Sequence, residues 1–124
     1  MAGPSPQQPR RVLFVEDEPS LCLSYGRFFA DRYEMVFAAS GADALAALDR
    51  FAPEVVVLDL LLPDTDGVEL LQRLRARLPA LPVVITTAYL SMEPLMSVLN
   101  LGHSGYLVKP FELTALRTLI DAAG

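Results

Sequence analysis

Five short apolar runs, rich in β-branched residues, alternate along the chain with longer segments of helical periodicity. This alternation is typical of βαβ units, in which helices cover both faces of a parallel sheet. The predicted strands lie near residues 11–16, 33–38, 54–59, 82–87 and 104–108. The predicted fold is therefore α/β, with one doubly wound, five-stranded parallel sheet.

Helical segments follow the predicted strands, and two of them begin with clear signals. Pro19 suits the first turn of a helix over residues 18–31, where an N–H would have no partner. Ser40 is a typical N-cap for a helix over residues 42–51. The other helices are expected at residues 68–78, 92–101 and 112–123. The buried stripe of the third helix is expected to comprise Leu70, Leu71, Leu74 and Leu78.

The length and composition of the chain fit one domain. A chain of 124 residues with 52% hydrophobic residues can bury a core without disulfides, and a single cysteine excludes an internal one. Residues 1–10 are rich in proline and glutamine, which predicts a disordered tail before a domain over residues 11–124.

Charge and hydropathy limit the partners of this domain. A formal net charge of -5 argues against direct nucleic-acid binding, because phosphate contacts need clustered lysine and arginine. No apolar stretch reaches the roughly 18 residues of a membrane span. We therefore expect no membrane partner, and the single cysteine favours a reducing, cytoplasmic location.

Three acids stand at the ends of two apolar runs. Glu16 and Asp17 follow the first predicted strand, and Asp59 ends the third. If the strand order is 2-1-3-4-5, these strands are neighbours and the acids meet at the carboxyl edge of the sheet, where such folds bind ligands. Carboxylates packed together need a compensating cation, and oxygen ligands suit Mg²⁺.

Lys109 is the only lysine in the chain, while nine arginines supply the other positive charges. It stands before Pro110 at the end of the fifth predicted strand. A lysine ammonium is a compact charge on a flexible stem, whereas the arginine guanidinium is a planar fork. This choice indicates a small anion as the target of Lys109.

The chain resembles the receiver domain of two-component response regulators over residues 11–123. The motifs that carry the resemblance occur in the family's order, and together they are far more specific than any one alone. They are Glu16-Asp17, Asp59-x-x-x-Pro63-x-x-Asp66-Gly67, Thr87-Ala88 and Lys109-Pro110-Phe111. The resemblance implies a flavodoxin-like (βα)5 fold with strand order 2-1-3-4-5.

The resemblance also implies roles for the acids. Asp59 would be the phosphoacceptor, taking a phosphoryl group from a sensor histidine kinase or a phosphotransfer protein. Mg²⁺ would be held by Glu16, Asp17, Asp59 and the backbone carbonyl of Leu61. The domain would catalyse its own phosphorylation and slow dephosphorylation, and would not turn over a metabolite as an enzyme does.

Lys109 and Thr87 would contact the phosphoryl group, and the family's Lys-Pro bond is usually cis. Thr86 competes with Thr87 for this role, because successive strand residues point to opposite faces; we choose Thr87, the residue before Ala88. Tyr106 matches the family's switch residue, whose ring turns inward as the threonine moves.

The fourth helix is unusually apolar, with Leu95 and Leu99 on one side. We expect the surface of the fourth helix, fifth strand and fifth helix to bind a second copy or an effector after phosphorylation. A broad stripe that simply packs on the sheet is the alternative.

Other functions fit parts of the same pattern. Glu16 and Asp17 could cap the first helix. A phosphatase of the haloacid dehalogenase type also uses a strand-end aspartate and Mg²⁺, but it needs a second acid where this chain has Leu61. A receiver-like module that binds partners without phosphorylation is the main alternative. The chain contains neither G-x-G-x-x-G nor a P-loop, which argues against a nucleotide-binding domain.

Overall fold

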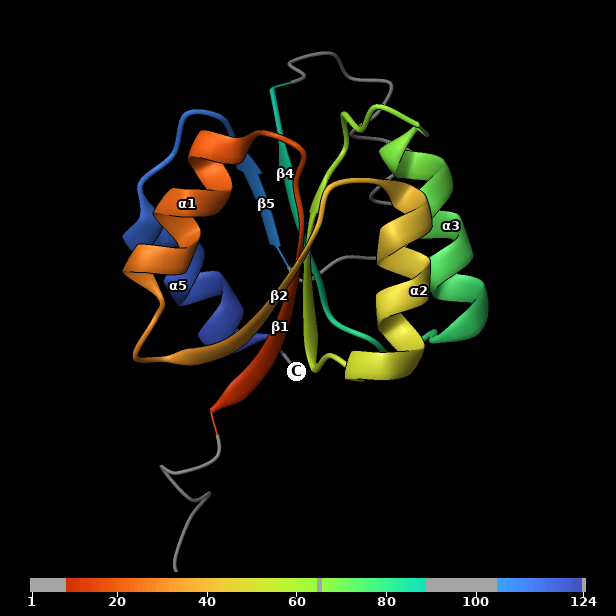
Figure 1. Cartoon of the computed structure of the whole chain (residues 1–124), viewed down its shortest axis with the longest axis horizontal. Helices are drawn as coiled ribbons and strands as arrows, with labels where there is room; N and C mark the ends of the chain where they lie inside the picture. Colours follow the sequence, from red (N-terminus) through yellow and green to blue (C-terminus); the bar gives the residue numbers. More distant parts are fainter. Residues whose placement is uncertain (1–8, 65, 89–104, 124) are drawn as a thin grey trace, which may run out of the picture.

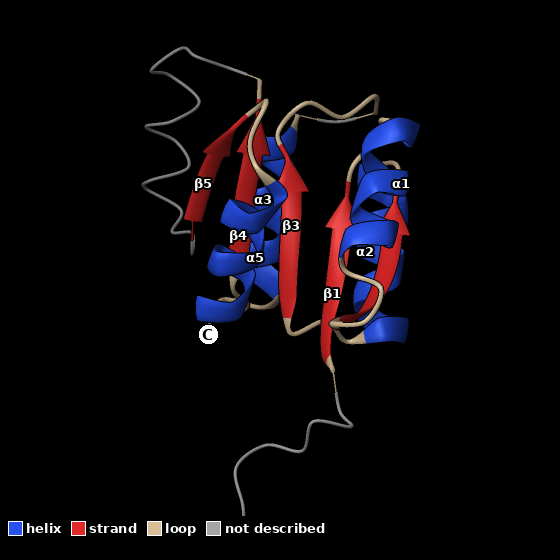
Figure 2. Cartoon of the chain, turned by 90° about the vertical axis from the view of Figure 1, so that its left-hand side faces the viewer, coloured by secondary structure: helices blue, strands red, loops and turns tan. Residues whose placement is uncertain are grey.

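One five-stranded parallel sheet forms the centre of the molecule. A computed structural model describes residues 9–64, 66–88 and 105–123. The strand order is β2-β1-β3-β4-β5, as predicted, and all strands point the same way (Figure 2). The strands are β1 (Arg10–Val15), β2 (Tyr33–Ala38), β3 (Val55–Asp59), β4 (Val83–Thr87) and β5 (Gly105–Val108).

Helices cover both faces of the sheet, as the alternating pattern predicted (Figure 1). On one face lie α1 (Pro19–Phe28) and α5 (Leu113–Ala122). On the other lie α2 (Gly41–Phe51) and α3 (Gly67–Arg77). The helix expected at residues 92–101 lies outside the described residues.

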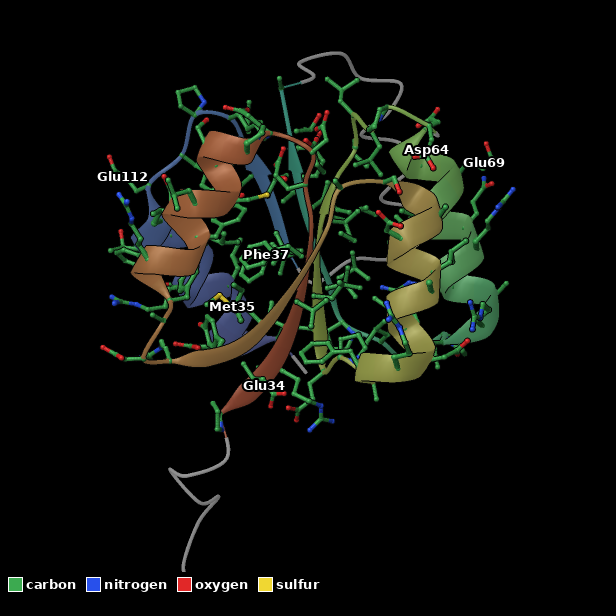
Figure 3. The ribbon with its side chains drawn as sticks, viewed as in Figure 1. Glu34, Met35, Phe37, Asp64, Glu69 and Glu112 are labelled. Carbon is green, nitrogen blue, oxygen red and sulfur yellow. The ribbon has the colours of Figure 1, made fainter. Side chains whose placement is uncertain are left out.

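The core has two parts because the sheet is buried on both faces. Every residue of β3 is buried, which explains why its sequence is a continuous apolar run and not an alternating one. One cluster packs against α1 and α5 and includes Phe14, Tyr25 and Phe29. The other packs against α2 and α3. Met35 and Phe37 of the edge strand β2 point toward the α1 side (Figure 3).

The helix starts agree well with the sequence signals, and the ends agree less well. Pro19 opens α1, and the Ser40 side chain accepts a hydrogen bond from the Asp43 N–H at 3.1 Å. However, α1 ends at Phe28, three residues earlier than predicted, because the chain turns so that Tyr33 of β2 packs on Phe29.

Two other predictions need correction. Leu78 lies beyond the end of α3 and is 41% exposed, whereas the other three leucines of the predicted stripe are buried. Arg10, which we placed in the tail, is the first residue of β1, and its guanidinium donates hydrogen bonds to the carbonyls of Ile120 and Ala123. Within the described residues, none of the helices is long and apolar enough to cross a membrane.

Two sets of hydrogen bonds hold the turn between β3 and α3. The Gly67 N–H donates to the Leu60 carbonyl at 2.9 Å, so the two backbones are in close contact. Asp64 accepts hydrogen bonds from the N–H groups of Gly41 and Ala42 at 2.8 and 3.2 Å, which fastens the turn to the start of α2 (Figure 3). This turn follows Asp59 directly, so its anchoring positions the carboxyl edge of the sheet.

Gly67→Ala should lower the free energy of unfolding by about 2 kcal/mol or more, a typical cost of overpacking. A Cβ at this position would lie 2.3 Å from the Leu60 Cα, so the backbone would have to move. Urea unfolding measures the change.

Gly26→Ala is the matched control. Its Cβ would meet only the Phe37 Cζ at 4.0 Å, and alanine favours the helix by about 0.5–1 kcal/mol. Equal effects of the two substitutions would contradict the close contact at Gly67.

Candidate functional site

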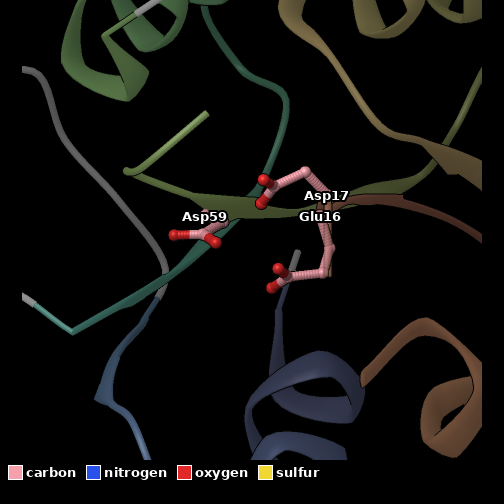
Figure 4. Close-up of side chains that lie close together, drawn as sticks. All are labelled: Glu16, Asp17 and Asp59. Carbon is pink, nitrogen blue, oxygen red and sulfur yellow. The ribbon is translucent and has the colours of Figure 1, made fainter. Parts of the chain in front are cut away.

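Three carboxylates meet where β1 and β3 end. Val15 of β1 pairs with Leu58 of β3, so Glu16 and Asp59 come next to each other at the carboxyl edge of the sheet. Glu16, Asp17 and Asp59 each offer an oxygen, and these oxygens lie within 4.8 Å of one another (Figure 4). Glu16 and Asp59 are only 2% and 3% exposed, whereas Asp17 is exposed. The predicted acidic cluster therefore forms.

Lys109 joins this cluster from the end of β5. Its Nζ donates to Glu16 Oε1 and to Asp59 Oδ2, both at 2.9 Å. Its backbone N–H donates to the Thr87 carbonyl at 2.8 Å, and its peptide bond to Pro110 is cis, as the family resemblance implied. The one lysine of the chain thus bridges two buried acids.

Burial and charge set the protonation of these groups. Burial is the main reason why the pKa of Glu16 is raised to about 7; the hydrogen bond from Lys109 opposes this shift and the Asp59 charge adds to it. Burial alone would lower the pKa of Lys109, but its bonds to Glu16 and Asp59 outweigh burial and raise that pKa. Lys109 therefore remains a cation.

The remaining oxygens of the two buried acids hold the adjoining loops. Glu16 Oε2 accepts from the Glu18 N–H at 3.2 Å, just before α1, and Asp59 Oδ1 accepts from the Leu61 N–H at 3.0 Å. Glu16 thus has part of the capping role considered above, while the N-cap residue Glu18 makes no side-chain cap. Glu16 thus contacts both Lys109 and the start of α1.

Thr86 and Thr87 face opposite sides of the sheet. Thr86 is the register partner of Asp59. It stands two residues after Val84, which packs on the α1 and α5 side, so it faces that side too. Thr87 stands two residues after Ile85, which packs with Tyr106 on the α2 and α3 side. The predicted switch pair, Thr87 and Tyr106, therefore shares one face, and its role stays a prediction.

Sequence reasoning missed several contacts around the site. The Cys22 thiol donates to the Glu16 carbonyl at 3.4 Å, and Tyr25 lies one turn later on the same helix. Both looked like ordinary apolar positions of an amphipathic helix. The anchoring role of Asp64 was also missed, although a Pro-Asp pair is a typical turn signal.

The family model of the response regulator receiver domain matches residues 12–121. This match covers nearly the whole chain. The chain belongs to this family. Its fold, doubly wound with order 2-1-3-4-5, and its cluster of acids with Lys109 agree with that membership.

Two curated relatives are transcriptional regulatory proteins that are longer than this receiver. The chain is 40% identical to the probable transcriptional regulatory protein TcrX of Mycobacterium tuberculosis, over 94% of this chain and 52% of that protein. It is 33% identical to the transcriptional regulatory protein GlrR of Escherichia coli, over 94% of this chain and 26% of that protein. The chain thus spans about half of the first relative and about a quarter of the second.

Solved structures show the same architecture. A CheY-like receiver domain protein from Methanospirillum hungatei has a TM-score of 0.87 at 28% identity, with 92% of each chain covered. The receiver domain of a putative LuxO repressor from Vibrio parahaemolyticus has a TM-score of 0.84 at 31% identity, with 91% of this chain and 88% of that chain covered.

The acidic cluster fits a hard divalent cation. Its donors are carboxylate oxygens, which Mg²⁺ prefers, and one of the three acids is exposed to solvent. Cys22 directs its thiol at a backbone carbonyl, so it competes for no ligand position. The donor set of this receiver is therefore consistent with Mg²⁺.

The metal-free receiver should become less stable as pH rises from about 4.5 to about 7. The folded pKa of Glu16 exceeds its unfolded value of 4.5, so the folded state binds more protons and loses this advantage as pH passes the folded pKa. Glu16→Gln should remove about 3 kcal/mol of this pH-dependent change in the free energy of unfolding.

The measurement is urea unfolding in chelator at several pH values. Glu69→Gln is the control, because Glu69 is exposed and pairs with Arg73 at the surface. A Glu16→Gln curve parallel to that of the unsubstituted protein would contradict the raised pKa.

Proposed function

We propose that this receiver is a phosphorylation-dependent switch in which Asp59 accepts a phosphoryl group from a histidine kinase or a phosphotransfer protein. The observation that supports this most is the Asp59 carboxylate, held by Lys109 at 2.9 Å beside Glu16 and Asp17. A buried nucleophile next to a fixed cation is what transfer of an anionic group requires.

The transfer is a single displacement at phosphorus. An Asp59 oxygen forms the new P–O bond, the P–N bond to the donor histidine breaks, and the electron pair leaves with the imidazole. The Lys109 ammonium stabilises charge on the phosphoryl oxygens, and the Thr87 hydroxyl donates to one of them. Water later hydrolyses the aspartyl phosphate slowly, without turnover of a metabolite.

Mg²⁺ would be held by Glu16, Asp17, Asp59 and the carbonyl of Leu61, where it would neutralise charge on the transferred group. Leu61 lies beside Asp59, since its N–H donates to the Asp59 carboxylate. This role leaves Lys109 free to exchange one carboxylate for a phosphoryl oxygen.

The output of the switch would pass through Thr87 and Tyr106 to the face formed by the fourth helix, β5 and α5. Tyr106 lies on the edge strand β5, and Val108 of the same strand is 38% exposed. We propose that a second copy or an effector binds this face after phosphorylation. The relatives' names point to transcriptional regulation as the downstream process.

Incubation with Mg²⁺ and acetyl phosphate should add one phosphoryl group to the protein, and Asp59→Asn should abolish the addition. Intact mass spectrometry measures the adduct. Asp49→Asn is the control, because Asp49 pairs with Arg77 between α2 and α3 and should leave the adduct unchanged. A folded protein that binds Mg²⁺ but forms no adduct would favour the phosphorylation-independent module.

Asp17→Asn should raise the Mg²⁺ dissociation constant about tenfold or more, because one charged ligand is lost while the buried acids and Lys109 remain. Isothermal titration calorimetry measures the constant. Asp31→Asn, in the turn after α1, supplies the matched control. Equal affinities of the two variants would exclude Asp17 as a ligand.

A further inference from the structure

Two buried hydroxyls of this receiver have no hydrogen-bond partner among the residues that the structure describes. They belong to Tyr25 of α1 and Thr86 of β4, whose exposures are 0% and 1%. Buried hydroxyls are almost always paired, either with protein or with ordered water, because an unpaired one loses its hydration without compensation. These two therefore need an explanation.

Both hydroxyls belong to the α1 and α5 side of the sheet, beneath the acidic cluster. Thr86 is the register partner of Asp59, two residues after the core residue Val84. The Tyr25 ring stacks on Phe14 at 4.8 Å, and Phe14 stands two residues before Glu16 on the same face of β1. The Tyr25 side chain from α1 and the Thr86 side chain from β4 thus enter the same layer of the core, between the sheet and the α1 and α5 helices.

Helix α1 is in direct contact with Glu16 at this level. Cys22, one turn before Tyr25, bonds to the Glu16 carbonyl at 3.4 Å. Burial first, and then the charges of Glu16 and Asp59, raise the pKa of Tyr25, so its hydroxyl keeps its proton and remains a donor in a region of negative charge. That region contains free carboxylate lone pairs among the described residues, since Lys109 donates one bond to Glu16 Oε1 and Glu18 donates one to Oε2.

We propose that the Tyr25 and Thr86 hydroxyls share one buried water that hydrogen-bonds to the Glu16 carboxylate and holds it in place. A buried water typically makes about three hydrogen bonds to otherwise unpaired groups, and these three partners satisfy that requirement. Tyr25 and Thr86 are then positioning residues, which act on the site through Glu16. Their effect on metal binding rests on the proposed function, whereas the shared water does not.

A double-mutant cycle in metal-free buffer tests the water. Tyr25→Phe and Thr86→Val each keep the shape of the side chain but remove one partner, so each should lower the melting temperature by about 4 °C. The double variant should lower the melting temperature by clearly less than the sum of the two single effects, because substitutions of residues that share one partner are not additive. Additive effects, or single variants at least as stable as the unsubstituted protein, would overturn the shared water.

Mg²⁺ titration tests the positioning role. Loss of a group that orients a ligand weakens metal binding by roughly tenfold or more, so both single variants should raise the dissociation constant. Tyr33→Phe is the matched control: its hydroxyl bonds to Asp121 at 2.6 Å at the opposite edge of the sheet. It should lower the melting temperature and leave Mg²⁺ affinity unchanged.

The two measurements separate the possible failures. Non-additive changes in melting temperature with an unchanged Mg²⁺ dissociation constant would overturn the positioning role but still support the shared water. An unsubstituted protein that binds no Mg²⁺ would contradict the proposed function, while the metal-free cycle would still decide whether the hydroxyls share a water.

Discussion

The ion pairs of Lys109 with Glu16 and Asp59 are the interaction on which the carboxyl edge of the sheet depends. Two acids that are 2% and 3% exposed cannot both be ionised side by side without a cation between them. Lys109 comes from the far end of the sequence, yet the strand order carries β5 to the same edge. The Lys109 ammonium and the hydrogen bond of its N–H to the Thr87 carbonyl together hold the end of β5 against the acids.

The topology explains why these residues meet. In the order 2-1-3-4-5, β1 and β3 are neighbours although a strand and two helices separate them in sequence, and their carboxyl ends form the switch point of the sheet. Burial of the sheet on both faces leaves its ends as the only polar places along the central strands. Glu16 and Asp59 occupy these ends, and their second oxygens bind the following loops.

Much of this arrangement could be predicted from the sequence. The apolar runs and the Ser40 cap predicted the positions of the strands and helices. The acids and Lys109 predicted the site, because a charged residue at the end of an apolar run is easily seen in the sequence. Leu78 and the end of α1 could not be predicted, since packing after the last helical turn decides them. Tyr25 was missed for a similar reason, and Thr86 was considered only as a rival of Thr87, because only the fold brings the acids near these two buried hydroxyls.

Under the proposed function, the same ion pairs set the free energy that separates the two states of the switch. Before transfer, Lys109 satisfies both Glu16 and Asp59. Afterwards, Asp59 carries the phosphoryl group, and Lys109 follows the larger negative charge, so Glu16 loses its principal partner. A buried carboxylate without a partner is costly. A divalent cation compensates for that loss, and a water fixed by Tyr25 and Thr86 keeps Glu16 oriented toward it. Metal binding and phosphorylation are then coupled through one side chain.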